Sequence, residues 1–321
     1  MVPAAMRRGG LLVVRRLTFM KKHDPKRLKT ESVSGVIYAG SAFLIWSLGP
    51  IYWKALAAVP PLEIILHRVV WAFIFLLVLI LIGRRWDELS RSLKDLKILL
   101  MLSVTAVILG LNWWLYVWAI NNNFVLQGSL GYYINPLVNV VFGVVFLRER
   151  LRPIQVLAVL LAGAGVVYLT ISYGSFPWIA IALAASFGLY GLIRKVAPVG
   201  PLVGLSIETM LLSIPAAAYL IYLGATGHGS FLRSSVRIDL LLLGTSVLTA
   251  VPLICFTAGA KRINLSTLGL LQYIAPTGIF LLAVFYFNEP FSVVQVWTFI
   301  MIWTALAIYS TDSVIFFRRT G

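Results

Sequence analysis

Residues 130–156 and 270–296 repeat one pattern at a constant offset of 140 positions and without a gap. The matching positions of the first copy are Leu130, Tyr133, Ile134, Pro136, Val144, Glu149, Gln155 and Val156, and their equivalents are Leu270, Tyr273, Ile274, Pro276, Val284, Glu289, Gln295 and Val296. Each copy lies in a half of the chain that contains five apolar stretches long enough to cross a membrane. An odd number of crossings reverses the side from which the second half enters. The sequence therefore predicts an all-α polytopic membrane protein, with ten transmembrane helices arranged as two inverted five-helix repeats.

The composition requires much of this chain to face lipid. Hydrophobic residues make up 60% and charged residues 12% of the 321 residues, which is more apolar surface than one water-soluble core can bury. A helix of about 20 apolar residues crosses a hydrocarbon layer of about 30 Å. Runs of this length lie near residues 34–54, 62–83, 98–120, 124–147, 153–172, 176–194, 202–223, 239–260, 265–287 and 291–315. The lipid bilayer is thus the first partner that the sequence predicts.

The repeat and the apolar runs divide the chain. The expected divisions are a basic, disordered cytoplasmic tail at 1–33, a first five-helix repeat at 34–172, a second at 173–315 and a short cytoplasmic tail at 316–321. Met20 is followed by a basic, polar stretch that leads directly to the first span, so translation could also start there. The sequence does not decide whether residues 1–19 are translated.

The net charge of +16 is distributed unevenly across the predicted membrane. Lys and Arg gather at 1–33, 84–97 and 148–152, all expected on one side, while the other side holds Lys54, Arg233 and Arg237. An excess of basic residues marks the cytoplasmic side, so both termini are predicted to be cytoplasmic. The same distribution explains the basic charge without nucleic acid, which is not expected as a partner.

Several polar side chains lie inside the predicted spans. Arg68 lies about two turns into the second span, and Glu208 lies at the equivalent depth of the seventh. Ionisable residues cost free energy in lipid and usually face a bundle interior or a water-filled cavity. In the third span, Asn112 and Tyr116 share one helical face. We expect these four residues to line a solute cavity, although a charge near a helix end can also have a purely local role, and His67 is expected to be a packing residue.

Two prolines and two tyrosines recur at equivalent positions in the fourth and ninth spans. Pro136 and Pro276 each remove a backbone donor and are expected to bend their helices. Tyr133 and Tyr273 precede them by one turn. We therefore predict hinges at the prolines, or else static kinks that improve packing, and place the tyrosines in the cavity.

The repeated glutamates, Glu149 and Glu289, come just before the next predicted helix. A carboxylate stabilises the positive end of a helix dipole. Both are expected to have this structural role.

No enzyme motif is present in the sequence. Phosphate-binding loops, paired histidines at metal spacing and the Gly-x-Ser-x-Gly nucleophile motif are all absent. Cys255 is the sole cysteine, so neither an intrachain disulfide nor a thiolate metal cluster can form. We predict no catalytic residues, no metal site and no cofactor.

The repeated proline and glutamate pattern resembles the EamA repeat of the drug/metabolite transporter superfamily. The segments around Glu63 to Trp71, Asn112 to Tyr116 and Ile207 to Thr209 are similar to those of its RarD branch. The resemblance spans roughly residues 34–315. It implies ten helices around a central cavity and a location in the bacterial inner membrane. EamA proteins move very different solutes, so the resemblance does not identify the solute.

The expected function is transport of a small metabolite or drug by a secondary carrier or facilitator. Export from the cell is one of the expected directions. In this mechanism the two halves expose a central polar and aromatic cavity to each side in turn. The alternatives are a channel-like pore, which would not saturate, and an intramembrane enzyme, for which His67 and Glu208 lack a catalytic partner. The sequence leaves open the solute, the direction, the coupling ion and the oligomeric state, a homodimer included.

Overall fold

The computed structural model describes residues 25–288 and 292–320, and the secondary structure in these ranges is helical. In chain order the elements are α2 (Pro25–Ser47), α3 (Gly49–Ala55), α4 (Pro61–Ile82), α5 (Trp86–Lys94), α6 (Leu96–Asn121), α7 (Val125–Leu147), α8 (Pro153–Ser172), α9 (Trp178–Val196), α10 (Pro201–Thr226), α11 (Val236–Ala260), α12 (Leu265–Leu271), α13 (Ile274–Leu281), the π-helix η1 (Leu282–Tyr286) and α14 (Val293–Thr320). The described part contains ten segments long and apolar enough to cross a membrane. The prediction of ten transmembrane helices is confirmed.

The helix ends follow from local sequence. Pro61, Pro153 and Pro201 occupy the first positions of α4, α8 and α10, where a missing N–H costs nothing. Asp95 caps α6 by accepting hydrogen bonds from the backbone N–H groups of Lys97 (3.0 Å) and Ile98 (3.2 Å). These caps place the span boundaries close to those expected from the apolar runs.

Two of the ten spans are built from more than one helix. The first consists of α2 and α3, which meet at Leu48. The ninth consists of α12, α13 and η1, with a break at Gln272 and Tyr273, ahead of Pro276. By contrast, α7 continues as one helix through Pro136. The two repeated prolines therefore lie in different backbone settings.

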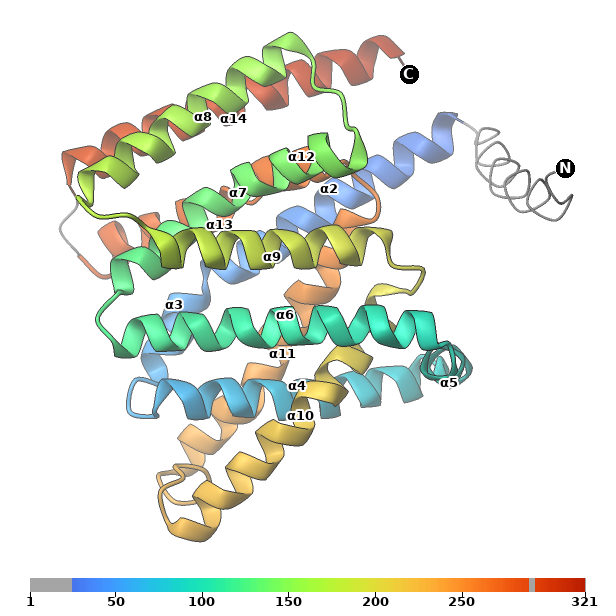
Figure 1. Cartoon of the computed structure of the whole chain (residues 1–321), viewed down its shortest axis with the longest axis vertical. Coiled ribbons are helices and arrows are strands. Elements are labelled where there is room, and N and C mark those ends of the chain that lie inside the picture. The colour runs from blue at the N-terminus through green and yellow to red at the C-terminus, as the bar shows by residue number, and fades with distance from the viewer. Residues whose placement is uncertain (1–24, 289–291, 321) are drawn as a thin grey trace, which may run out of the picture.

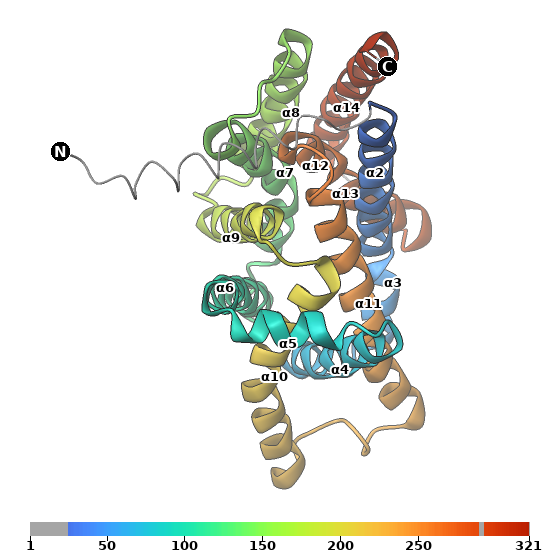
Figure 2. The same cartoon turned by 90° about the vertical axis from the view of Figure 1, so that its right-hand side faces the viewer.

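Helices from the two halves of the chain interleave. In Figure 1, α9 lies between α7 and α6. The most extensive helix contacts pair α7 with α9, α14 with α8, α10 with α4, and α11 with both α2 and α4. Each of these pairs joins a helix from the first half to one from the second. Figure 2 views α6 and α9 nearly end-on and shows α8, α7, α9 and α6 in one row, with α14, α12 and α2 in a second row beside it.

The start of α2, the short helix α5 and the end of α14 lie at one end of the helix bundle (Figure 1). We call this end the terminal face. The end that carries α3 and the connection between α10 and α11 is the opposite face.

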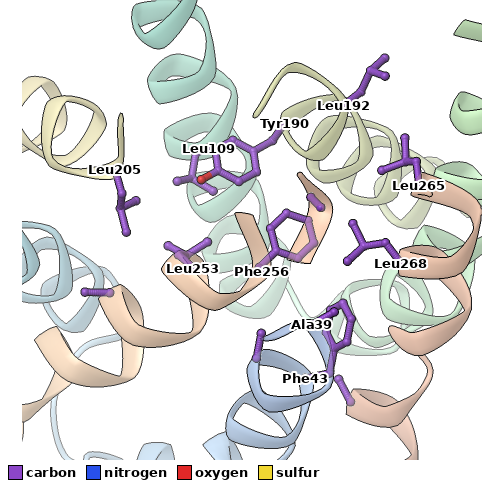
Figure 3. Packing of buried hydrophobic residues seen from close by; sticks show 14 of the residues in the cluster. Ala39, Phe43, Leu109, Tyr190, Leu192, Leu205, Leu253, Phe256, Leu265 and Leu268 are labelled. Carbon is purple, nitrogen blue, oxygen red and sulfur yellow. The ribbon is translucent and has the colours of Figure 1, made fainter. Parts of the chain in front are cut away.

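The largest buried cluster lies where α2, α9, α11 and α12 meet. Figure 3 shows Phe43, Tyr190 and Phe256 at its centre, with Leu265 and Leu268 of α12 beside them. The outer surface along the spans is apolar, and its exposed side chains include Ile82 (75% exposed), Ile171 (73%) and Phe285 (77%). Exposed apolar surface of this kind is stable in lipid and not in water.

Candidate functional site

Arg68 is held among aromatic side chains from three helices. Its Nε donates a hydrogen bond to Oγ1 of Thr249 in α11 at 3.1 Å. The guanidinium carbon lies 5.0 Å from the centre of a Trp53 ring and 5.1 Å from that of a Trp113 ring. This distance is within the range of a cation–π interaction. Arg68 lies about 10 Å along α4 from Pro61 by helix rise, yet it is only half-buried.

Two tyrosines complete this group. Tyr116 of α6 and Tyr132 of α7 have ring centres 6.1 Å apart in an edge-on arrangement, and both lie close enough to Arg68 to interact with its charge. Tyr132 remains 42% exposed. We call the six residues the Arg68 cluster, and they are Trp53, Arg68, Trp113, Tyr116, Tyr132 and Thr249.

The predicted residue Asn112 belongs to a different contact. Its Nδ2 donates to the Leu183 carbonyl oxygen at 3.0 Å and to Ser186 Oγ at 2.8 Å. Both acceptors are on α9. Asn112 therefore links α6 to α9, one turn away from Tyr116 on the same helix.

Glu208 lies in a second buried polar site, about 10 Å along α10 from its start by helix rise. Its Oε1 lies 3.4 Å from Nε of Arg194, and neither side chain is exposed. Thr105 donates to Oε1, and the Tyr190 hydroxyl donates to Oε2 at 3.3 Å. Glu208 is thus paired with Arg194 and not with Arg68.

The guanidinium of Arg194 occupies space left by a glycine. A Cβ added to Gly204 would lie 2.0 Å from its Nη1. One of its nitrogens, Nη2, donates to the Pro201 carbonyl at 3.2 Å. Nε and Nη1 are buried without a hydrogen bond of good geometry, so the 3.4 Å approach to Glu208 is electrostatic contact and no more. Sequence reasoning missed Arg194 because it stands next to Lys195 and reads as an ordinary flanking charge.

Tyr133 and Tyr273 meet each other away from the Arg68 cluster. The Tyr273 hydroxyl donates to the backbone carbonyl of Tyr133 at 3.3 Å. Tyr273 is fully buried, and the Tyr133 ring packs edge-on against Phe299 of α14 at 5.7 Å. The pair thus joins the two repeated segments at equivalent positions.

The same two segments cross closely near Pro136. A Cβ on Gly269 would lie 2.5 Å from the Pro136 carbonyl oxygen, so α7 and α12 approach each other at backbone distance. One turn further along α7, the buried Asn139 donates to Oε1 of Gln272 at 2.7 Å. Pro276 is also buried.

On the terminal face, polar side chains tie the halves together. Glu149, which follows α7, accepts from the backbone N–H groups of Leu265 (2.6 Å) and Ser266 (2.9 Å) and from the Ser266 hydroxyl (2.6 Å). It therefore caps α12 in the other half and not the next helix, α8, which was expected. Glu289 lies outside the described residues.

Two lysines add hydrogen bonds between helix ends within the second half. Lys195 Nζ donates to the carbonyl of Ala260 at 2.7 Å and to that of Ile263, and Lys261 Nζ donates to the carbonyl of Ala197. Burial beside the positive charges of Arg194 and Lys195 lowers the pKa of Lys261 to about 8. The end of α9 and the end of α11 are thus bound to each other through their last carbonyls.

A cavity of about 310 Å³ lies near the opposite face, between α4, α10 and the loop after α10. Glu63 borders it and accepts from the Ser230 backbone N–H at 2.6 Å and hydroxyl at 2.9 Å. His67 is buried, and its Nδ1 accepts from Trp71 Nε1 at 3.0 Å. Glu63 therefore anchors the loop over the end of α4.

The described residues contain no group of three His, Cys, Asp or Glu side chains that could hold a metal ion. The polar sites of the spans are made of charged side chains, hydroxyls, amides and aromatic rings. Such groups can bind and orient a small molecule.

Comparison with known proteins gives a consistent result. The model of the EamA-like transporter family matches residues 33–171. An uncharacterized transporter of Vibrio cholerae is 47% identical over 282 residues, which cover 88% of this chain and 93% of that protein. The protein RarD of Escherichia coli is 46% identical over 291 residues, covering 91% and 98%. A crystal structure of another protein has the same fold, with a TM-score of 0.68 and 20% identity over 90% of this chain and 99% of that one.

Proposed function

Because this chain belongs to the EamA-like transporter family, and RarD proteins are among its relatives, we propose that it is a secondary carrier or facilitator of a small solute. It is a multi-pass membrane transporter: the described residues contain ten helices of membrane-spanning length, and the names of the family and of the Vibrio cholerae relative point to transporters and not to enzymes. The proposal adds that the solute binds at the Arg68 cluster and crosses by alternating access.

The observation that carries this proposal is the setting of Arg68. A charge within a membrane span costs roughly 2.5–3.5 kcal/mol on insertion scales, and a helix that needed only packing would have an apolar residue there. The side chain is half-buried and surrounded by rings from α3, α6 and α7. Such a site can receive a solute while keeping lipid out.

Alternating access requires contacts that can close one face and release. The Glu149 contacts on the terminal face are hydrogen bonds between the two halves, and those of Lys195 and Lys261 join α9 to α11 within the second half; all three side chains bond to backbone groups at helix ends. Breaking them exposes these groups to water, which replaces the lost hydrogen bonds, so the cost is modest. We take them as the closed gate of this conformation.

Uptake into proteoliposomes tests the carrier mechanism. A panel of organic acids, amino acids, nucleosides, cationic drugs and phenicols would be offered to the purified protein, with Arg68→Gln as the variant and Arg237→Gln, an exposed arginine of α11, as its matched control. A carrier should saturate with solute and lose uptake in Arg68→Gln alone. Linear uptake together with ohmic conductance would instead support the channel-like pore.

The hinge proposal concerns Pro136 and Pro276. A helix that changes shape needs a weak point in its hydrogen-bond ladder, which proline provides. The double variant Pro136→Ala, Pro276→Ala should bind solute with nearly unchanged affinity and transport it more slowly. Unchanged transport rates would show that both prolines serve packing.

The proposed orientation places the terminal face in the cytoplasm, as the distribution of basic residues indicates. Single cysteines introduced by Arg150→Cys and Ser234→Cys in a Cys255→Ser background test it. An impermeant thiol reagent added to intact cells should label position 234 and spare position 150. Labelling at 150 would reverse the orientation.

A further inference from the structure

We infer that the Arg68 cluster selects organic monoanions, a single carboxylate on a flat apolar body, over zwitterions and cations. This inference rests on the proposed carrier function and names the class of its solute. It depends on the charges and hydrogen-bond donors around Arg68.

The positive charge of Arg68 is not compensated by any acidic side chain in the described residues. The carboxylates of the neighbouring helices and their contacts are Glu63 with Ser230, Glu208 with Arg194, and Asp239 with the backbone N–H of Leu232. The spans formed by α6 and α7 carry no acidic residue. A carboxylate supplied by a solute would therefore be the counter-ion that the protein does not provide.

The guanidinium of Arg68 also keeps donors available. Of its five N–H groups, the one on Nε is used by Thr249. Among the described residues, the hydrogen bond of the Arg68 side chain is the one from Nε, and the two terminal nitrogens make none. Those nitrogens form the edge of the fork that binds a carboxylate with two parallel hydrogen bonds. The hydroxyls of Tyr116 and Tyr132 are hydrogen-bonded to each other, which leaves one of them as a further donor nearby.

The walls of the cluster favour a flat body. Trp53 and Trp113 present rings within 5.1 Å of the guanidinium carbon, and aromatic surfaces prefer to stack on planar groups. The tyrosine pair adds two more rings. A planar apolar group attached to the carboxylate would pack against these rings beside the guanidinium.

The same arrangement excludes other charge types. An amino acid would bring an ammonium group, and the cluster holds no carboxylate to receive it, so a charge would be desolvated without a partner. A cation would meet the charge of Arg68 directly. One arginine balances one negative charge, so a dianion would retain an unpaired charge.

Equilibrium binding to the protein in lipid nanodiscs tests the inference. The probes are benzoate, cinnamate and indole-3-acetate, compared with the neutral amide of each and with phenylalanine and benzylamine. At least one of the acids should bind saturably, and its amide, the zwitterion and the cation should bind roughly 10- to 100-fold more weakly, the factor expected for a lost charge-assisted contact.

Variants assign the binding to Arg68. Arg68→Gln should weaken binding of the acid to the level of its amide, Arg68→Lys should retain part of it because the charge remains without the fork, and Arg237→Gln should change nothing. If Arg68→Gln fails to fold, the Arg68→Lys variant and the comparison of each acid with its amide still test whether Arg68 binds the carboxylate. Equal binding of acids and amides, or binding of none of the three acids, would overturn the inference.

The outcome separates this inference from the carrier proposal. Saturable uptake of a different solute that benzoate, cinnamate and indole-3-acetate do not inhibit would refute the monoanion site and leave the carrier intact. Arg68-dependent binding of an acid that is never taken up would refute the carrier and leave the anion site intact.

Discussion

Glu149 offers the sharpest test of how the terminal face is closed. Its carboxylate accepts three hydrogen bonds, two of them from the first backbone N–H groups of α12. In Glu149→Ala these two donors lose their partner, and the negative charge at the helix N-terminus is lost as well. The variant should therefore weaken the closed terminal face and leave the interiors of α7 and α12 unchanged.

The magnitude follows from the contacts. Loss of an N-terminal cap costs about 0.5–2 kcal/mol, and loss of a charge at the positive end of the helix dipole adds about 0.3–1 kcal/mol. Together these give roughly 1–3 kcal/mol, which shifts an equilibrium between closed and open faces by a factor of about 5–150. A shift of this size makes a minor open state readily detectable.

Spin labels on the two sides of this contact report the change. Arg150→Cys and Asn264→Cys place labels on exposed positions of the two halves, in a Cys255→Ser background, and pulsed electron resonance gives their distance distribution. Glu149→Ala should add a population at longer distance. Asp87→Ala removes an exposed carboxylate of α5 on the same face and is the control. If both variants leave the distribution as it is in the parent, Glu149 does not hold the face closed.

A second substitution reaches the same contact while leaving the carboxylate in the chain. A Cβ on Gly143 would lie 2.5 Å from Oε2 of Glu149 and 2.9 Å from Oγ of Ser266. Gly143→Ala should therefore displace the carboxylate and open the face as Glu149→Ala does. A closed distribution in Gly143→Ala would show that the side chain can shift without losing its function.

Two further predictions concern stability near the terminal face. Gly204→Ala should lower the free energy of unfolding by roughly 1–3 kcal/mol through overpacking, because the new Cβ would lie 2.0 Å from Nη1 of Arg194. Thermal unfolding in detergent measures this loss, with Gly40→Ala as the control because nothing lies within 4 Å of a Cβ there. Equal losses in the two variants would contradict the packing argument. Because the pKa of Lys261 falls to about 8 in the folded protein from an ordinary 10.5, the unfolded chain binds more protons between these pH values, so the free energy of unfolding should rise with pH across this window. Lys261→Met should flatten that part of the profile, and an identical slope in both proteins would refute the assignment.

The number of spans and the position of Arg68 could be predicted from the sequence because both depend on local signals. A run of apolar residues fixes where a helix crosses, and an arginine inside such a run is visible at once. Arg194 gave no such signal, since a basic pair at the end of a span is normal. Its burial depends on Gly204, on another helix, which leaves the space that its guanidinium fills.

The candidate site was harder to predict because facing residues come from distant helices. Tyr132 is a member of the Arg68 cluster, while its neighbour Tyr133 points to Phe299 of α14. Adjacent residues on a helix point about 100° apart, so choosing one tyrosine over the other required knowing which helices flank α7. In a helix that is apolar on all sides, the periodicity of the sequence is too weak to show which face points to the bundle interior.

The interleaving of the two halves has a consequence for how the protein is made. When the first five spans have left the ribosome, Asn112 still lacks its acceptors on α9, and Asn139 still lacks Gln272. Polar groups of this kind are costly against lipid until a partner helix arrives. These contacts can therefore form only after the sixth and the ninth spans are synthesised, so assembly of the bundle follows insertion of the first five spans. A nascent chain that stalls midway would present these amides to the bilayer, where chaperones or membrane proteases can recognise them.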